Sequence, residues 1–262
     1  MIHTASPLDF NPDPEKVIPV AISAITNLLK STAASPDAKR FVFTSSSAAV
    51  YTPVPDKPGR VTAEDWNEEA VKDAWAPPPY EPSRAFQVYA ASKTQAEQAL
   101  WKWCREQGKT ERPDLVVNAV LPNANIGTVL DPKLQGFRST AGAFKLMWDG
   151  NLEVHIAVIM PQYYIDVQDD ARLHLAALLL NDVQNERIFA FAGVFDYNTE
   201  LAAFRKADPH RKLPDDVKDP PKHLVKVPNE RAEELLKRVA RKGWTSFDDS
   251  IALMVKSYKQ AE

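Results

Sequence analysis

The sequence predicts an α/β fold, because short buried strands alternate with helices along the chain. Asp13-Pro14 followed by apolar residues at helical spacing predicts a helix over 14–30. The apolar run FVF predicts a buried strand at 41–43, and DLVVNAVL predicts another at 114–121. The long helical stretch SRAFQVYAASKTQAEQALWKWCREQG lies between these two strands. In open α/β sheets of this kind, ligands bind outside the carboxyl ends of the strands.

Composition limits the function classes. The chain has 262 residues, of which 44% are apolar and 26% charged, so it can bury a sizeable core. A net charge of −3 argues against nucleic acid or an anionic membrane as a partner. Cys104 is the only cysteine, so we expect no intrachain disulfide and a reducing, cytoplasmic location. The five histidines lack the spacing of metal ligands, so we expect no metal site. The sequence has no run of 18 apolar residues and no charged-then-apolar leader, so we expect neither a membrane span nor a signal peptide.

A tyrosine and a lysine lie four residues apart in the long helical stretch. Tyr89 and Lys93, in the motif VYAASK, would share one face of a helix. A neighbouring ammonium favours the phenolate, so we expect Lys93 to lower the pKa of Tyr89 from about 10 toward the range of a general acid. Because such pairs also occur by chance in helices, the spacing alone is a weak signal.

Three serines follow the strand predicted at 41–43. Ser45, Ser46 and Ser47 stand where the strand runs out, at its carboxyl end. Hydroxyls at this position could donate to a substrate oxygen. The alternative interpretation is that they cap an ordinary turn.

The strand with its serines, RFVFTSSSAAVY at 40–51, followed by Tyr-x-x-x-Lys about 40 residues later, resembles the extended short-chain dehydrogenase/reductase superfamily. Longer blocks narrow the resemblance. VYAASKTQAEQALWKW, NAVLPNANIGTVLDP at 118–132 and MPQYYIDVQDDARLHLAAL at 160–178 are similar to the fungal NADPH-dependent aldehyde and ketone reductases, a group close to the plant dihydroflavonol reductases. The similarity runs from His3 to about Ile251.

This resemblance implies a Rossmann-like, doubly wound parallel sheet that lacks its first strands, with a smaller mixed C-terminal part. Residues 1–127 would be the remaining half of the dinucleotide-binding domain, and 128–262 mainly the substrate-binding part with some return to the main sheet. It also implies that NADPH reduces a small carbonyl substrate while Tyr89 protonates the oxygen. Lys93 would lower the pKa of Tyr89 and bind the nicotinamide ribose. Ser46 would hold the carbonyl oxygen, with Ser47 as the alternative if epimerase-like relatives are the better guide.

Further site residues are also implied by the resemblance rather than by spacing. Ala5-Ser6 would lie close to the cofactor, and the alternative interpretation of this segment is a frayed terminus. Pro122-Asn123 would contact the nicotinamide, and the alternative interpretation is an ordinary strand-terminating turn. Adjacent tyrosines at 163 and 164 point to opposite faces of a strand, so only one can line a pocket. The implied cofactor-binding residues are Ala5, Ser6, Tyr89, Lys93, Pro122 and Asn123, and the implied substrate-binding residues are Ser46, Gln162 and Tyr164.

One family feature is missing from the sequence. A dinucleotide site of this type needs a glycine-rich turn that lets backbone N–H groups approach the pyrophosphate. Nothing among the eight glycines matches G-x-x-G-x-x-G. We therefore expect a chain that corresponds to the family without its first three strands, from a truncated gene product or an incomplete gene model.

The missing turn leaves three functions open. The first is the carbonyl reductase, and the second is a non-catalytic remnant that cannot hold the cofactor. A sugar-nucleotide epimerase or dehydratase is the third, and Leu121-Pro122 counts against it, because many such enzymes carry Arg-Pro there. We expect weak NADPH binding by the chain alone and self-association through the exposed edge of a strand at Met1–Thr4.

The remaining elements are predicted from local patterns. A proline-rich insertion at 53–83 should contain one short helix capped by Thr62 with Asp65. Asp169-Asp170 should cap the helix ARLHLAALLL. We also expect a helix at 140–148, strands at 162–167 and 187–192, and three helices after residue 198.

Overall fold

A computed structural model of the chain describes residues 1–239 and 243–262, which form two compact units. The first unit comprises Met1–Thr52, Val61–Pro122 and Leu173–Phe189. The second comprises Pro53–Arg60, Asn123–Arg172 and Ala190–Glu262. The predicted α/β class is confirmed, whereas the domain division into 1–127 and 128–262 stays a prediction.

A four-stranded sheet forms the centre of the first unit. Its strands lie in the order β1 (Ile2–His3), β2 (Arg40–Thr44), β4 (Val116–Pro122) and β7 (Arg187–Ala190). β1 runs parallel to β2, and β2 runs parallel to β4. Each strand comes later in the chain than its neighbour, which is the order of one half of a doubly wound sheet. β1 lies at the edge of the sheet among the described strands.

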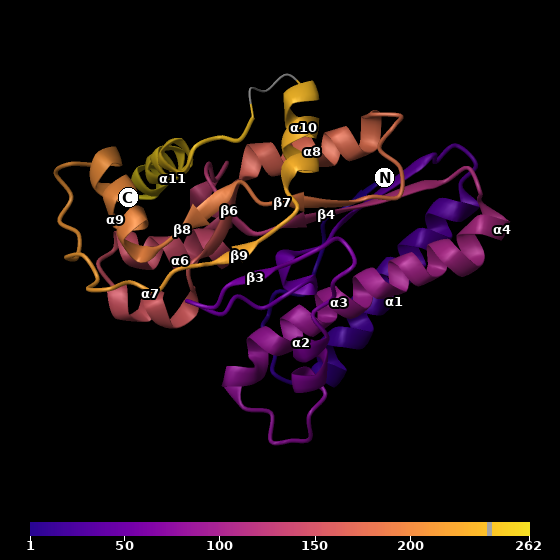
Figure 1. Cartoon of the computed structure of the whole chain (residues 1–262), viewed down its shortest axis with the longest axis horizontal. Helices are drawn as coiled ribbons and strands as arrows, with labels where there is room; N and C mark the ends of the chain where they lie inside the picture. Colours follow the sequence, from indigo (N-terminus) through magenta and orange to yellow (C-terminus); the bar gives the residue numbers. More distant parts are fainter. Residues whose placement is uncertain (240–242) are drawn as a thin grey trace. The chain divides into compact units, whose positions relative to one another are not determined.

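Helices cover both faces of this sheet. Because side chains alternate along β2, neighbouring residues of this strand contact helices on opposite faces. Phe43 faces α3 (Ala85–Trp103), where the Lys93 ammonium lies 5.7 Å from the centre of its ring. Thr44 faces the other way, and its Oγ1 lies 2.7 Å from His174 Nε2 on α8 (Val167–Leu179). α1 (Pro14–Ala34) packs beside α3 (Figure 1), and α2 (Glu68–Ala74) packs against the same helix.

Side chains fix both ends of α1. Asp13 caps its first turn by accepting from the backbone N–H of Glu15 at 3.1 Å. At the other end Arg112 donates to the carbonyl oxygens of Ala33 at 2.9 Å and Ala38 at 2.6 Å. A cation that binds the last carbonyls also opposes the negative end of the helix dipole. The helix predicted at 14–30 is therefore confirmed and continues to Ala34.

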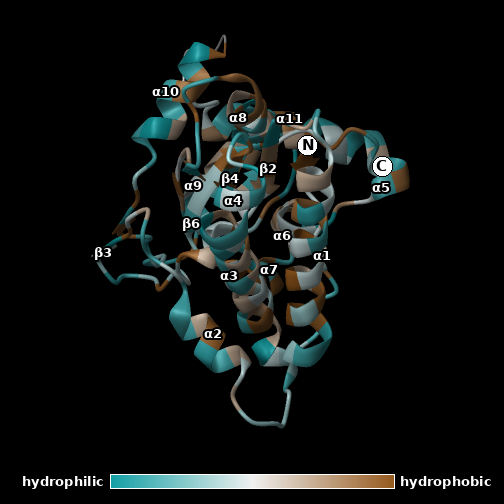
Figure 2. Cartoon of the chain, turned by 90° about the vertical axis from the view of Figure 1, so that its right-hand side faces the viewer, coloured by the Kyte–Doolittle hydropathy of each residue, from teal (hydrophilic) through white to brown (hydrophobic). Residues whose placement is uncertain are grey.

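The part of the chain that the structure describes contains one helix, α1, that could cross a membrane by length and composition alone. Figure 2 shows apolar residues at intervals along it. Because α1 contains no 18 consecutive apolar residues, the sequence predicted no membrane span here. Val17, Ile18, Ile25 and Leu29 on α1 are buried, whereas Val20 is exposed.

The second unit is built on a small mixed sheet. β5 (Ala124–Ile126) runs parallel to β6 (Gln162–Asp166), which pairs antiparallel with β8 (Gly193–Phe195). A separate parallel pair joins β3 (Gly59–Arg60) to β9 (Val225–Lys226). The helices are α5 (Pro132–Gln135), α6 (Ser139–Trp148), α7 (Leu152–Val158), α9 (Tyr197–Ala207), α10 (Glu230–Arg238) and α11 (Phe247–Ala261).

Two predicted helix caps are wrong. Thr62 and Asp65 form a turn, in which Asp65 accepts from the N–H of Thr62 at 2.7 Å, but α2 begins only at Glu68. Its cap is Asn67, which accepts from Ala70 N–H at 3.1 Å and is held in place by donating to the Ala48 carbonyl at 2.9 Å.

The second wrong cap belongs to α8. Asp169 and Asp170 do not precede the helix, because α8 already begins at Val167, and both carboxylates lie in its first turn. Asp166 just before the helix accepts from Gln168 N–H at 2.9 Å instead. Negative charge in the first turn still favours the helix dipole.

A histidine and a glutamate are buried against each other in the second unit. His155 Nε2 on α7 lies 3.0 Å from Glu200 Oε2 on α9, and the other ring nitrogen lies 2.8 Å from the Ala143 carbonyl oxygen. Burial raises the pKa of Glu200 to about 7, although His155 opposes the shift. Burial alone would lower the pKa of His155, but its bond to Glu200 raises it. The folded unit therefore holds protons that an unfolded chain would release near neutral pH.

We predict that this pair makes the second unit less stable as the pH rises. Groups whose pKa is raised on folding contribute stability below their unfolded pKa, and that stability is lost as the pH rises through the folded pKa. Between pH of about 5.5 and about 8, the wild type should lose on the order of 1 kcal/mol more than Glu200→Gln, whose amide cannot ionise. Urea unfolding at both pH values is the measurement. Glu153→Gln on the exposed side of α7 is the control, and equal pH dependence in the wild type and Glu200→Gln would contradict the prediction.

Candidate active site

Ser46, Tyr89 and Lys93 come together at the carboxyl end of β2. The strand ends at Thr44, and Ser46 stands just before the short 3-10 helix η1 (Ser47–Ala49). The hydroxyl of Ser46 interacts with that of Tyr89 and lowers the pKa of the phenol. Lys93 Nζ, one turn further along α3, donates to the Thr44 carbonyl oxygen at 3.2 Å. The structure thus brings together the three residues predicted as catalytic.

Lys93 is a buried cation. Its side chain is only 6% exposed, and its ammonium lies over the ring of Phe43. Burial lowers the pKa of Lys93 to about 8, and the negative charge of Glu97 opposes the shift. Lys93 therefore remains mostly protonated at neutral pH.

Tyr89 lies beneath two aromatic rings, and its surroundings do not lower its pKa. The ring centroid of Phe10, from the loop after β1, is 5.4 Å away, and that of Phe86 is 6.1 Å away. Burial raises the pKa of Tyr89, and only its hydrogen bond to Ser46 opposes this. The prediction that Lys93 lowers the pKa of Tyr89 is therefore wrong, because desolvation outweighs a cation directed at the Thr44 carbonyl. Tyr89 keeps its proton at neutral pH.

The three serines have different surroundings. Ser45 is buried and donates to Glu97 Oε2 at 2.7 Å. Ser46 bonds to Tyr89, and its Oγ also accepts from the Ala48 N–H at 3.2 Å. Ser47 is half-buried at the start of η1. The contact with Tyr89 favours Ser46 over Ser47, and the choice between them stays a prediction.

Sequence reasoning missed Glu97, which lies one helical turn beyond Lys93 on α3 and holds Ser45 and Arg187 in place. Glu97 is fully buried and accepts from Arg187 Nε at 2.7 Å and Nη2 at 3.2 Å. Trp101 Nε1 donates to its Oε1 at 3.0 Å, and Ser45 bonds to Oε2. Tyr89, Lys93 and Glu97 stand at i, i+4 and i+8 on α3, so helical spacing from the Tyr-Lys pair was a usable signal.

Four further predicted residues lie near strand ends. Ala5 is exposed and Ser6 half-buried in the loop after β1. Pro122 ends β4, and the buried Asn123 follows it. Asn123 Oδ1 accepts from the next N–H at 2.8 Å, while its Nδ2 has no hydrogen-bond partner among the described residues. The cofactor-binding roles of these residues stay predictions.

The predicted substrate-binding residues of the second unit lie on β6. Gln162 is half-buried, and its Nε2 donates to the Met160 carbonyl oxygen at 3.1 Å. Tyr164 is 7% exposed, packs edge-on against Phe247 and donates its hydroxyl to the Thr245 carbonyl oxygen at 3.1 Å. These contacts favour a packing role for Tyr164. Its role in substrate binding stays a prediction.

The first unit fits one end of a nicotinamide dinucleotide. Lys93 makes a single described hydrogen bond through its ammonium, which leaves two N–H groups for the hydroxyls of a ribose. The pyrophosphate end requires a glycine-rich turn, and the 262-residue sequence has none. The residues present therefore fit the nicotinamide ribose and not the phosphates.

A sheet with helices on both faces and polar side chains at the carboxyl ends of its strands defines a Rossmann-like protein. The family model described as "Male sterility protein" matches residues 1–148. The NAD-dependent epimerase/dehydratase terH of Aspergillus terreus is 40% identical over 258 residues, which cover 97% of this chain and 74% of that protein. Aldehyde reductase 2 of Sporidiobolus salmonicolor is 39% identical over 256 residues, with 97% and 73% covered. The chain belongs to the extended short-chain dehydrogenase/reductase family.

Solved structures agree with this fold. Gre2 of Candida albicans in complex with NADPH has a TM-score of 0.81 at 22% identity, covering 100% of this chain and 77% of that one. Vestitone reductase from alfalfa has a TM-score of 0.72 at 20% identity, with 99% and 75% covered. The chain spans about three quarters of the length of the curated relatives it matches.

Proposed function

We propose that this protein catalyses the NADPH-dependent reduction of a small aldehyde or ketone to an alcohol. The observation that carries the proposal is the geometry at the carboxyl end of β2, where Ser46 precedes η1, Tyr89 and Lys93 lie one turn apart on α3, and the Lys93 ammonium bonds to the Thr44 carbonyl oxygen at 3.2 Å. Relatives named aldehyde reductase 2 and ketoreductase support the substrate class. We propose a small carbonyl compound as the substrate, and the cytoplasmic location stays a prediction.

Each residue has a separate role in the proposed reaction. Bound NADPH would supply the hydride that reaches the carbonyl carbon. Ser46 donates to the carbonyl oxygen and orients it toward Tyr89. Tyr89 then gives its hydroxyl proton to that oxygen, so the alcohol forms and a phenolate remains. The positive charge of Lys93 stabilises this phenolate, which is the charge that develops during the reaction.

A second candidate function is a non-catalytic remnant of such a reductase. Under this candidate the 262 residues, which contain no match to the glycine-rich pattern, would not hold the pyrophosphate. Weak NADPH binding by the chain alone is expected under both candidates. Self-association through the edge strand β1 is a further proposal, since unpaired backbone groups can pair with another chain.

A chimera tests the reductase directly. The part of aldehyde reductase 2 that precedes the matched region is joined ahead of Met1, and NADPH oxidation is measured with an activated ketone. Tyr89→Phe should lower the rate by about 10²–10⁴-fold because it removes the proton donor, while NADPH affinity is retained. Tyr80→Phe also removes a tyrosine hydroxyl in the first unit and is the matched control.

Retention of a third of the activity by Tyr89→Phe would remove this tyrosine from the mechanism. A chimera that neither binds NADPH nor reduces the ketone would favour the remnant.

The serine assignment is tested in the same chimera. Ser46→Ala should lower the rate of ketone reduction more than Ser47→Ala, because Ser46 and not Ser47 influences the pKa of Tyr89. Steady-state rates of both variants are compared at saturating NADPH. Equal losses, or a larger loss for Ser47→Ala, would overturn the assignment.

A further inference from the structure

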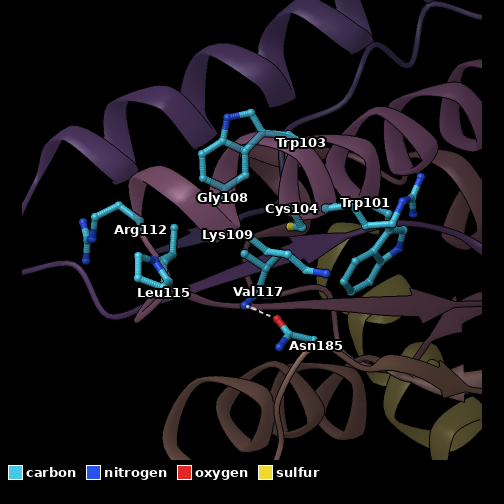
Figure 3. A pocket seen from close by; sticks show the side chains of 11 residues that line it. Trp101, Trp103, Cys104, Gly108, Lys109, Arg112, Leu115, Val117 and Asn185 are labelled. Carbon is cyan, nitrogen blue, oxygen red and sulfur yellow. Dashed lines mark hydrogen bonds between the residues drawn. The ribbon is translucent and has the colours of Figure 1, made fainter.

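The far end of the α3 helix borders a hollow of about 360 Å³ (Figure 3). Beyond Trp103 the helix continues as a π-helical turn, η3 (Cys104–Gly108), and then as α4 (Lys109–Glu111). Cys104 comes 15 residues after Tyr89, so at the helical rise of 1.5 Å per residue the hollow lies about 20 Å from the proposed active site. It belongs entirely to the first unit and is separate from the residues proposed for carbonyl reduction.

The π-helical turn and a glycine shape this hollow. π-Turns inside helices are rare and are often found at functional sites. A Cβ atom on Gly108 would lie 2.9 Å from the Trp103 ring, so a larger residue would push the indole out of place. Leu115 and Val117 form an apolar wall at the start of β4, and Asn185 fixes that wall by accepting from Val117 N–H at 3.2 Å, the dashed line in Figure 3.

The walls of the hollow combine indole rings with cations. Trp101 and Trp103 line it together with Arg105 and Lys109. Both cations are exposed and make no ion pair with any residue the structure describes. Arg112 also borders the hollow, but its guanidinium is occupied by helix carbonyls and by Asp114, at 2.9 Å.

A second, adjoining hollow increases the positive charge. It measures about 290 Å³ and shares Trp101 and Arg105 with the first, while Trp66, Gln98 and Lys102 form the rest of its lining. Three cations, Lys102, Arg105 and Lys109, therefore line the two hollows that Trp101 borders. The carboxylate that accepts from Trp101 Nε1, Glu97, is paired with Arg187.

We propose that the first hollow binds a small organic anion that carries a flat aromatic ring. The ring packs against the indoles and the apolar wall, and the anionic group accepts hydrogen bonds from Arg105 and Lys109. The volume is within the range of small-molecule sites, about 300–1,000 Å³. Neither an uncharged ring nor a ring-free anion uses both features of the walls, so the site favours an aromatic carboxylate.

The test measures binding of naphthalene-2-carboxylate to the full 262-residue chain. Titration calorimetry and quenching of tryptophan fluorescence are the two measurements. We expect saturable binding that the double variant Arg105→Gln/Lys109→Gln weakens at least tenfold. Both side chains are exposed, so this variant should keep the wild-type unfolding temperature. Lys72→Gln, an equally exposed cation of the first unit on α2, is the control and should leave the affinity unchanged.

Two further measurements separate ring and charge. Naphthalene-2-carboxamide lacks the anion, and cyclohexanecarboxylate lacks the aromatic ring, so both should bind at least tenfold more weakly. Raising the salt from about 50 mM to about 500 mM should weaken binding of the carboxylate, since exposed cations are screened. No saturation, equal binding of the amide, or an unchanged affinity of the double variant would overturn the proposal.

Discussion

The buried carboxylate of Glu97 fixes the geometry on which the candidate site depends. It accepts hydrogen bonds from three side chains, Arg187, Trp101 and Ser45, so both of its oxygens are satisfied away from water. Removing one partner of a buried ion pair typically costs about 3–5 kcal/mol, because the other charge is left uncompensated. This carboxylate therefore anchors α3 to the sheet and to the serine turn at once.

Two consequences follow for the residues above Glu97 on the same helix face. Lys93 stands one turn away and Tyr89 two turns away, so anchoring the helix directs both at the end of β2. The bond from Ser45 to Glu97 holds the first serine inward, which leaves Ser46 to meet Tyr89. The negative charge also supports the ammonium of Lys93 against burial, which would otherwise favour its neutral form.

Local patterns predicted much of the first unit, and distant contacts explain the rest. The strand at 41–43, the helix at 14–30 and the Tyr-Lys spacing each depend on neighbouring residues, so periodicity was sufficient. The pairing of Glu97 with Arg187 joins residues 90 positions apart, and no local sequence pattern predicts it. The raised pKa of Tyr89 depends on burial, and part of that cover is Phe10 from a loop far away in the sequence.

The wrong helix caps have the same kind of cause. Thr62 and Asp65 matched a capping pattern, but the buried Asn67 binds the Ala48 carbonyl and fixes the helix start further along the chain. The π-turn before Lys109 had no signal in the sequence apart from Gly108, whose closeness to Trp103 is visible only in three dimensions.

The titration of Lys93 tests this account most directly. Lysine side chains labelled with ¹³C at Cε are followed by NMR as the pH rises, and the Lys93 signal is assigned by its loss in Lys93→Met. We expect a pKa of about 8 for Lys93, and a still lower pKa in Glu97→Gln, where the supporting charge is gone. A Lys93 signal that titrates near the ordinary value of about 10.4, or that is unchanged in Glu97→Gln, would contradict it.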